Sequence, residues 1–400
     1  MLEAIKIEDL KPGMFVNDVI EQNGKLRIKT KGLVKSVKSI DILKSKGVTK
    51  VEIDISRSNL PPPPVNSEPK ESTTQENTAP VSPKKTSFSD SEQLEAATKL
   101  YDEALTIQSR FFKRLAANDT PSLSDVKDLS ANIIESVFNM PNGLSCLTLL
   151  NKSGKYLLEH SLNCSILLTM FAKYRDMGRQ AIEELSLAGL LMDVGMTNMP
   201  KDITQSAGKL TPQQKEIITT HVDIGLDLVD RCGDVAASVQ DIIFNHHERI
   251  DGSGYPDAQT DHDVSEYARM AGIVDSYDAM INDRPFRKAV TPSRALVKLL
   301  SDESYDQVLV AQFIKCLGVH PVGSLVKLDN DRLAIIMRGN KETPMKPIVA
   351  AFYNLKTASY SEVKKIDLSQ VNVKIISAVR PEEFGLNLTK FLKEILITAL

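Results

Sequence analysis

The chain has 400 residues, of which 42% are hydrophobic, and its formal net charge is −3. This length suggests two or three domains with ample apolar material for a core. The slightly acidic balance argues against a surface that binds nucleic-acid polymers, while a local basic pocket remains compatible with it.

The N-terminal residues show no long apolar run of the kind found in a secretory signal. No stretch reaches the roughly 18 consecutive apolar residues of a membrane span. The four cysteines are widely spaced in apolar surroundings, which is typical of reduced core residues: Cys146, Cys164, Cys232 and Cys316. We therefore expect a cytoplasmic protein without a membrane partner.

Residues 1–56 are expected to form a small α+β module. Apolar and polar residues alternate as in strands at residues 4–7, 14–20, 25–28 and 50–55. A short helix fits residues 37–46 and would end at Gly47. No residue here suggests chemistry, so we interpret the module as a regulatory or protein-contact domain.

Residues 57–90 are predicted to be a disordered linker. Four prolines open it at 61–64, and Ser, Thr, Glu, Asn and Pro dominate up to Ser89. Such a composition buries too little apolar surface to offset the entropy lost on ordering.

Residues 91–321 have the spacing of a helical bundle. Apolar residues recur on one helix face at Leu94, Ala97, Tyr101 and Leu105. Thr211-Pro212 and Thr291-Pro292 are helix-start signals, in which an N-cap residue precedes a first-turn proline. Glycines at 178, 195, 233 and 318 are expected to end helices.

Residues 322–400 are expected to be a short β-rich extension with a terminal helix. Residues 324–328 and 333–337 read as a hairpin, 348–353 as a third strand, and 383–400 as a helix. The predicted fold class is therefore mainly α: a helical bundle between a small α+β domain and a β-rich extension.

The run from His246 to Pro256 is the most informative in the chain. It holds two of the six histidines side by side, followed by a glycine-bearing loop that Tyr255-Pro256 closes. Neighbouring helical side chains point about 100° apart, so a helix rarely buries both on one apolar face. Two metals, or a metal and a substrate, could use both imidazoles.

Further metal-ligand types occur in the same region. His160 and His221 precede the pair, and Asp193 and Asp275 lie within strongly apolar sequence. For either carboxylate alone, a helix end that reaches solvent is an equally good interpretation, but the whole set favours a metal site. Mixed imidazole and carboxylate ligands suit Fe, Mn or Zn better than Ca or Mg, and no cysteine pair has zinc-finger spacing.

These motifs resemble those of the HD-GYP family of bacterial cyclic di-GMP phosphodiesterases, a branch of the HD phosphohydrolase superfamily. His246–Pro256 matches the HHExxDGxGYP signature at every defined position. The segments 160–161, 221–225, 275–280 and 284–287 match the family's other elements in order. The resemblance covers about residues 156–328 and implies an HD-type helical bundle. Residues 4–55 look like the small domain that often precedes this catalytic domain.

The resemblance implies metal-dependent hydrolysis of cyclic di-GMP to linear pGpG, GMP or both. It implies two Fe or Mn ions, or a single one. His160 and Asp275 would hold one metal, His221 and His246 the other, and Asp193 would bridge them. His247 would be a further ligand or contact substrate, and Asp193 and His221 are assigned to catalysis. The implied substrate-binding residues are Asp251, Gly252, Gly254, Tyr255, Pro256, Arg284 and Arg287.

Two of these assignments compete with plain structural interpretations. Arg284 and Arg287 are three residues apart, hence on one face if helical, and planar guanidinium groups suit phosphate. Without the resemblance, such a run would be read as solvated surface. Tyr255 could stack on guanine, or it could simply pack in a tight turn against the bundle. Diguanylate cyclase domains or other signalling proteins are implied partners beside cyclic di-GMP.

The departures from the family pattern affect the expected activity. Met192 stands where the HD pair should begin, and Met196 replaces a lysine. A thioether is a poor ligand for Fe or Mn, although both methionines would pack well in a core. Tyr156 replaces a glutamate that holds a third metal in some members. We expect an attenuated phosphodiesterase.

Two other functions stay open. The first is a catalytically inactive HD-GYP-like module that binds cyclic di-GMP or a signalling protein. The second is another HD-type nucleotide phosphohydrolase, which the Gly-Tyr-Pro loop makes a poorer match.

Overall fold

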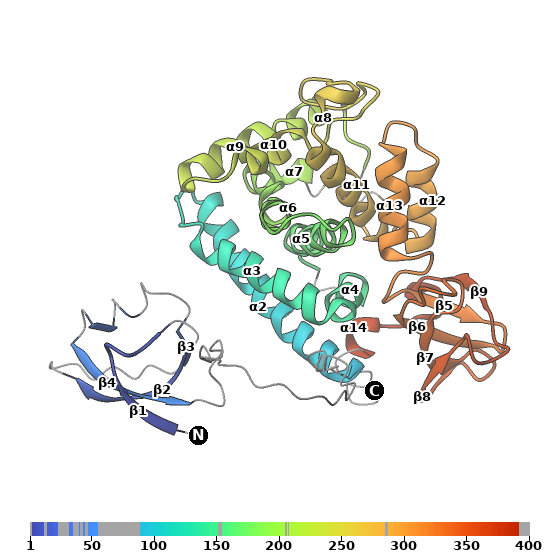
Figure 1. Ribbon diagram of the computed structural model, residues 1–400. Helices are drawn as coiled ribbons and strands as arrows, with labels where there is room; N and C mark the ends of the chain where they lie inside the picture. The colour runs from blue at the N-terminus through green and yellow to red at the C-terminus, as the bar shows by residue number, and fades with distance from the viewer. Residues whose placement is uncertain are drawn as a thin grey trace, which may run out of the picture. The chain divides into compact units, whose positions relative to one another are not determined.

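The computed structural model describes residues 2–11, 14–22, 32–34, 40, 43–44, 47–54 and 89–391, apart from 151–153, 205, 207, 285 and 286. The chain divides into two compact units, Met1–Pro83 and Lys84–Leu400 (Figure 1). The predicted linker lies outside the described residues except for Ser89 and Asp90, and its bounds stay a prediction.

The smaller unit contains an antiparallel sheet in the order β1-β4-β2-β3. Its strands are β1 Leu2–Lys6, β2 Phe15–Gln22, β3 Gly32–Leu33 and β4 Val48–Asp54. Alternate residues of the central strand β4 are buried, Val51 and Ile53 among them, which is the pattern of a sheet with one face on a core. Three of the predicted strands are confirmed. The predicted strand 25–28 and most of the predicted helix 37–46 lie outside the described residues.

The larger unit is mainly helical, as predicted. Its α-helices are α2 Asp90–Ala116, α3 Ser124–Asn139, α4 Pro141–Leu150, α5 Tyr156–Tyr174, α6 Arg179–Leu191, α7 Lys201–Thr204, α8 Pro212–Thr219, α9 His221–Cys232, α10 Ala237–Asn245, α11 Glu266–Ile281, α12 Pro292–Leu300, α13 Gln307–Leu317 and α14 Leu388–Phe391. Short 3₁₀ helices are η2 Val194–Asn198, η3 Asp261–Asp263 and η4 Pro381–Phe384. The predicted start at Thr211-Pro212 is confirmed, because Thr211 and Gln214 form a capping box.

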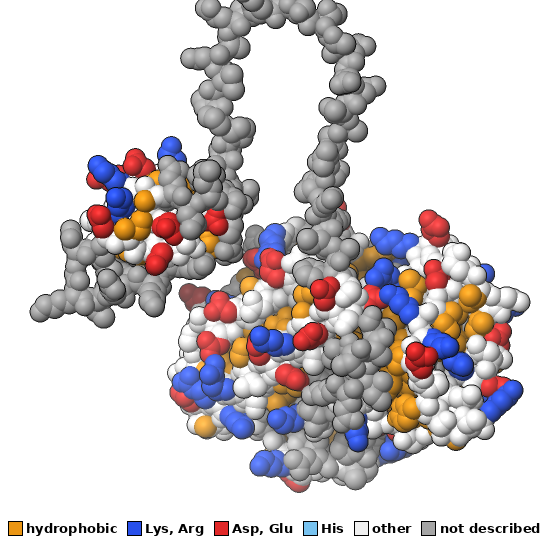
Figure 2. All heavy atoms as spheres, turned by 90° about the horizontal axis from the view of Figure 1, so that it is seen from below, with side chains coloured by type: hydrophobic (Ala, Val, Ile, Leu, Met, Phe, Trp, Pro, Cys, Tyr) orange, Lys and Arg blue, Asp and Glu red, His pale blue; other side chains and the backbone are white. Residues whose placement is uncertain are grey.

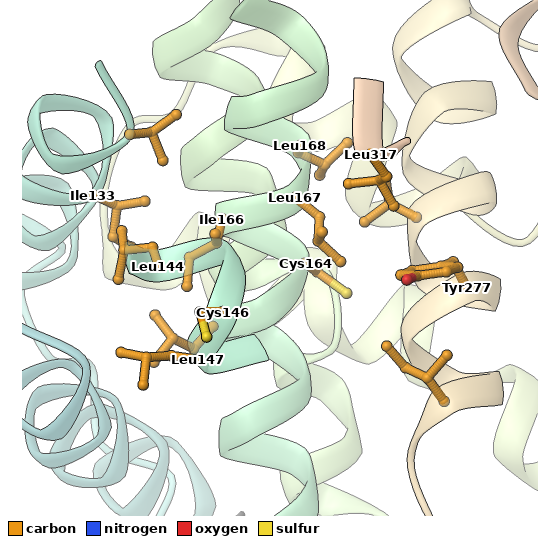
Figure 3. Packing of buried hydrophobic residues seen from close by; sticks show 14 of the residues in the cluster. Ile133, Leu144, Cys146, Leu147, Cys164, Ile166, Leu167, Leu168, Tyr277 and Leu317 are labelled. Atoms are coloured by element: carbon orange, nitrogen blue, oxygen red, sulfur yellow. The ribbon is translucent and has the colours of Figure 1, made fainter. Parts of the chain in front are cut away.

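Helix α5 lies at the centre of the bundle (Figure 1). Its side chains are buried without a break from Glu159 to Thr169, which is the pattern of a helix enclosed on every side. Figure 3 shows Ile166 pointing towards Ile133 and Leu144 on one side, while Leu168 points towards Leu317 on the other. His160, the predicted metal ligand on α5, is therefore carried by a helix that core packing holds on both sides.

Helix α6 and η2 approach their neighbours through glycines. A Cβ atom on Gly189 would lie 2.5 Å from the Ser165 nitrogen of α5, and one on Gly195 would lie 1.9 Å from the His221 carbonyl oxygen of α9. Gly195 is therefore not the helix end predicted from sequence: it allows η2 to approach α9 closely. This contact places Asp193, which directly precedes η2, beside His221.

Replacing Gly195 by alanine is expected to destabilise the protein by about 3 kcal/mol, at the upper end for overpacking, because backbone atoms rather than a flexible side chain must move. Gly178→Ala is the matched control, since a Cβ there meets nothing within 4 Å. Chemical denaturation of both variants measures the difference. Equal stability of the two variants would contradict the close approach of η2 to α9.

The C-terminal extension is an antiparallel sheet in the order β8-β7-β6-β5-β9. Its strands are β5 Leu325–Leu328, β6 Arg332–Arg338, β7 Ile348–Asn354, β8 Ser359–Asp367 and β9 Ile375–Ala378. The predicted hairpin and third strand are confirmed, and β8 and β9 are additional. The predicted helix over 383–400 is wrong at its start, where η4 ends at Phe384, Gly385 adopts a left-handed conformation and α14 begins at Leu388. Residues 392–400 lie outside the described residues.

Asp90 ties this sheet to the start of the bundle. Its buried carboxylate accepts hydrogen bonds from Arg338 of β6, at 2.7 Å, and from Lys365 of β8. Burial alone would raise the pKa of Asp90, but the hydrogen bonds from Lys365 and Arg338 outweigh it and lower the pKa. The carboxylate is therefore charged and paired where α2 begins.

The described surface in Figure 2 carries basic and acidic side chains interspersed. This mixture agrees with the small net charge of the chain. None of the helices within the described ranges has the length and apolar content that crossing a bilayer requires.

Candidate metal centre

The predicted metal ligands come from five separate segments of the larger unit. His160 lies on α5, Asp193 directly follows α6, and Asp275 lies on α11. His246 and His247 follow the last turn of α10. Both aspartates are only 6% exposed, so the interpretation as solvent-facing helix ends is wrong for each.

His221 is the first residue of a helix and does not lie in the middle of one. The helical segment is interrupted at Thr220, and His221 becomes the first residue of α9. Thr220 directs both its amide and its hydroxyl hydrogen to carbonyls of the preceding turn, which closes α8. The break orients the imidazole of His221 towards Asp193.

Asp193, His221, His246 and His247 form the first donor group, in which one ligand atom from each lies within 4.8 Å of the others. The Nδ1 atom of His221 lies 2.7 Å from the Ile218 carbonyl oxygen, which can only accept a hydrogen bond. Nδ1 of His246 likewise faces carbonyl oxygens of α10. Nδ1 therefore carries a proton in both rings, so Nε2 is the atom that keeps a lone pair when each ring is neutral.

These Nε2 lone pairs fit a cation. Nε2 of His221 and of His246 is buried without a hydrogen-bond partner among the described residues. They lie 3.6 Å and 4.0 Å from the Asp193 Oδ1 atom, so the lone pairs of two nitrogens face an oxygen that is itself an acceptor. Buried polar atoms are rarely left unsatisfied, and a divalent cation between these three ligand atoms would satisfy all of them.

The second donor group consists of His160, Asp193 and Asp275. His160 Nε2 lies 2.9 Å from an oxygen of Asp275 and 3.3 Å from Asp193 Oδ2. Asp193 thus belongs to both groups and faces each with a different oxygen. The group offers one imidazole and two carboxylates, against three imidazoles and one carboxylate in the first group.

Asp278 orients His160 and was not predicted. Its Oδ2 atom lies 2.7 Å from His160 Nδ1, and Asn163 donates to its other oxygen at 2.9 Å. Tyr101 in turn donates to Asn163 at 2.8 Å. A carboxylate behind a metal-binding imidazole fixes its orientation and raises its basicity. The spacing of Asp275 and Asp278, three apart on α11, is the sequence signal that could have indicated this role.

Burial sets the charge states of the His246–His247 pair, whereas interaction with His160 sets those of the two carboxylates. Burial lowers the pKa of His246 and holds the pKa of His247 well below its usual range, so both imidazoles are neutral, as metal ligands must be. Burial alone would raise the pKa of Asp193 and Asp275. Interaction with the nearby His160 imidazole outweighs this effect and lowers the pKa of both carboxyls.

The residues that depart from the family pattern occupy different environments. Met192 is fully buried in the core, whereas Met196 is partly exposed and lines the cavity described below. Tyr156 stacks on the His160 ring with centroids 5.3 Å apart. The Arg284 guanidinium lies 4.8 Å from the centre of the Tyr156 ring and donates a hydrogen bond to its hydroxyl.

A cavity of about 680 Å³ opens over the centre. Its polar walls come from the metal-ligand candidates on one side and from basic and hydroxyl groups on the other. The lining residues that can contact a ligand through polar atoms include His160, Asp193, His221, His247, Asp275, Arg249, Arg284, Arg287, Lys298, Tyr255 and Tyr305. Four cationic side chains beside a carboxylate-lined centre suit an anionic ligand.

Arg284 and Arg287 both line this cavity, but no helix carries them. Arg284 and Arg287 exchange backbone hydrogen bonds of 2.9 and 3.1 Å and form an isolated β-bridge. Asn282 leaves the helical conformation at the end of α11, and α12 starts at Pro292, so Arg284 and Arg287 lie between the two helices. We call the described residues 283–284 and 287–290 the arginine turn.

The loop after His247 presents Tyr255 to the cavity. Tyr255 stacks on His247 with ring centroids 4.6 Å apart, and its peptide bond to Pro256 is cis. The other predicted substrate-binding residues of this loop do not line the cavity: Asp251, Gly252, Gly254 and Pro256. Gly254 lies against the chain at residues 247–249, where a Cβ atom would approach Arg249 N to 2.5 Å. Gly252 has a φ angle of 76°.

Glu248 and Arg249 support this loop and were not predicted. The buried carboxylate of Glu248 accepts hydrogen bonds from the amides of Asp257 and Gln259, at 2.7 and 3.0 Å. Arg249 donates to the carbonyls of His246 and Glu248 and lies 4.7 Å from the centre of the Tyr305 ring. Its guanidinium is thereby held as a flat wall of the cavity.

Comparison with known proteins shows what these residues are similar to. Residues 131–309 match the model of the HD domain, and residues 2–126 match a domain of unknown function. The first match agrees with the predicted similarity to HD proteins, and it contains every candidate metal ligand described above.

Two relatives and one solved structure illustrate the similarity. A protein named cyclic di-GMP phosphodiesterase from Pseudomonas aeruginosa is 28% identical over 92% of this chain and 90% of the relative. One of the same name from Thermotoga maritima is 30% identical over 37% of this chain and 47% of the relative. The solved structure of an HDGYP protein from Bdellovibrio bacteriovorus is 16% identical, with a TM-score of 0.49, over 79% of this chain and 99% of that chain.

Proposed function

We propose that this chain, which carries an HD domain at residues 131–309, is a metal-dependent phosphodiesterase that hydrolyses cyclic di-GMP to pGpG, GMP or both. The observation that carries the proposal is the pair of donor groups joined by Asp193 at the floor of a cationic cavity. The relatives named for this activity support the choice of substrate.

The two donor groups suit divalent metals of the Fe or Mn type, since they mix imidazole with carboxylate. We propose His221, His246 and His247 as ligands on one side, His160 and Asp275 on the other, and Asp193 between them. A cation bound there would stabilise the charge that develops on a phosphodiester and make water a better nucleophile. The first group, with three imidazoles, would hold its metal more tightly than the second.

The remaining cavity residues would bind and orient the dinucleotide. Arg284 and Arg287 present guanidinium groups that can pair with phosphate oxygens. Tyr255 and the flat Arg249 guanidinium offer faces on which a guanine can stack. The loop residues Asp251, Gly252, Gly254 and Pro256 would act by shaping the backbone that carries Tyr255.

We propose that the activity is attenuated. Met192 is a core side chain, so the second donor group lacks the imidazole that the HD pair would supply. Met196 puts an uncharged thioether into the cavity wall where the pattern calls for an ammonium group. The same two residues favour one alternative function, a module that binds cyclic di-GMP or a signalling protein without hydrolysing it.

Turnover of cyclic di-GMP by the purified protein tests the proposal. With Mn(II) or Fe(II) present, we expect linear pGpG or GMP to accumulate in a chromatographic assay. Calorimetric binding of cyclic di-GMP without any linear product would instead establish the binding module.

Chelation is expected to abolish turnover, and adding Mn(II) back should restore it. The reason is that the cation supplies the positive charge that stabilises the transition state. The atoms left behind, Nε2 of His221 and His246 and the Asp193 carboxylate, are acceptors and cannot supply it. The assay is turnover before chelation, after it and after metal addition. Full activity in the chelated protein would contradict the assigned role of the donor groups.

A further inference from the structure

The arginine turn is closed by backbone contacts of its own. Besides the Arg284–Arg287 bridge, the Ala289 amide donates to the Asp283 carboxylate at 2.8 Å, and the Val290 amide donates to the Met280 carbonyl at 2.9 Å. These contacts fix both ends of the turn to the end of α11. They leave the carbonyl oxygen of Ala289 to a partner from outside the turn.

That partner comes from the C-terminal extension. Arg380 lies 91 residues further along the chain, between β9 and η4, and its Nη1 atom donates to the Ala289 carbonyl at 3.1 Å. Arg380 is itself held in place, because its amide donates to Glu383 at 3.0 Å and the neighbouring Val379 amide donates to Leu325 of β5 at 3.0 Å. The C-terminal sheet thus holds the Arg380 guanidinium in place, and this guanidinium holds the arginine turn.

Apolar packing accompanies this hydrogen bond. A small cavity of about 50 Å³ is walled by Val290 and Pro292 on the side of the arginine turn, and by Leu325, Pro381 and Leu388 on the side of the extension. The two segments therefore line one small pocket next to the hydrogen bond. The contact directly follows the residues that present Arg284 and Arg287 to the large cavity.

We infer that Arg380 is a positioning residue through which the C-terminal sheet holds the arginine turn ready for an anionic substrate. The inference rests on the proposed function, in which Arg284 and Arg287 bind the phosphates. Ordering a side chain during binding weakens affinity, and a turn that is already fixed avoids that cost. The extension thereby belongs to the substrate-binding machinery, although it contributes no residue to the lining of the large cavity.

Arg380→Ala is expected to raise KM for cyclic di-GMP about 10-fold, the effect of having to order one or two side chains on binding. The kcat should stay within about twofold, because the groups that act on the reacting phosphate are untouched. Metal content should be unchanged, and Arg380→Lys should recover most of the lost affinity. Arg338→Ala is the matched control: it removes an arginine of the same sheet whose partner is Asp90, away from the arginine turn.

Hydrogen exchange in the absence of nucleotide tests separately whether Arg380 holds the arginine turn. The amides of residues 289 and 290 should exchange faster in Arg380→Ala than in wild type, and at the wild-type rate in Arg338→Ala. Unchanged exchange and unchanged KM in Arg380→Ala would overturn the inference, as would an equal rise in KM in Arg338→Ala. A wild-type protein that neither binds nor hydrolyses cyclic di-GMP would refute the proposed function, while the exchange rates would still decide whether Arg380 holds the turn.

Discussion

Replacing Asp193 by alanine is expected to lower turnover of cyclic di-GMP at least about 100-fold, since even loss of a residue behind a ligand costs about 10–100-fold. The carboxylate lies 3.3 Å from His160 Nε2 and 3.6 Å from His221 Nε2, on opposite oxygens. Its removal takes a ligand from both donor groups at once. We therefore expect metal content, measured by mass spectrometry, to fall together with turnover.

Asp227→Ala provides the control for this variant. Asp227 lies on the exposed side of α9, where it pairs with Arg231 one turn later, so its loss should change neither metal content nor turnover. Thermal melting of both variants shows whether the fold is kept. Wild-type turnover in a folded Asp193→Ala protein would refute the role of Asp193 as the residue shared by the two donor groups.

Replacing Met196 by lysine is expected to raise turnover on the order of 100-fold, the size of effect that one well-placed charge-stabilising group has on a transition state. Met196 lines the cavity one 3₁₀ turn after Asp193 and is partly exposed, so an ammonium group at this position can reach the cavity while its stem keeps the apolar packing. Steady-state kinetics on metal-loaded protein measure the gain, which should appear mainly in kcat.

Met196→Leu is the control that separates the effect of the added charge on kcat from that of a changed side-chain shape. It keeps the apolar side chain and should leave kcat at the wild-type value. If Met196→Lys folds, binds metal and still shows wild-type kcat, the missing lysine does not explain the proposed attenuation, and the burial of Met192 becomes the remaining cause within the proposed site.

The helical core of the fold could be predicted because its signals are local. The helix starts at Thr211-Pro212 and Thr291-Pro292 are visible in the sequence. Strand β8 could not be predicted in the same way, because it lies at the edge of its sheet and its residues are half-buried or exposed. The close approach at Gly195 could not be predicted, because its partner α9 lies further along the chain. From the local sequence alone, Gly195 resembles the end of a helix.

The meeting of the histidines and aspartates at one site could be predicted, because imidazoles and carboxylates within apolar sequence need a shared partner such as a cation. The roles of Asp278 and Glu248 could not, since each acts through contacts that only the folded chain creates. The spacing of Arg284 and Arg287 suggested a helix face, yet the turn after α11 brings both into the cavity by a different backbone geometry. Residue types thus indicated the chemistry, and tertiary structure supplied the residues that orient it.

The measurement that tests the account most directly is turnover as a function of bound metal on one preparation. Metal-free protein is loaded stepwise with Mn(II), the bound metal is counted by mass spectrometry, and hydrolysis of cyclic di-GMP is assayed at each step. We predict no linear product without metal and a rate that rises with metal occupancy. A fully loaded protein that binds the nucleotide and releases it unchanged, or a metal-free protein that hydrolyses it, would contradict the account.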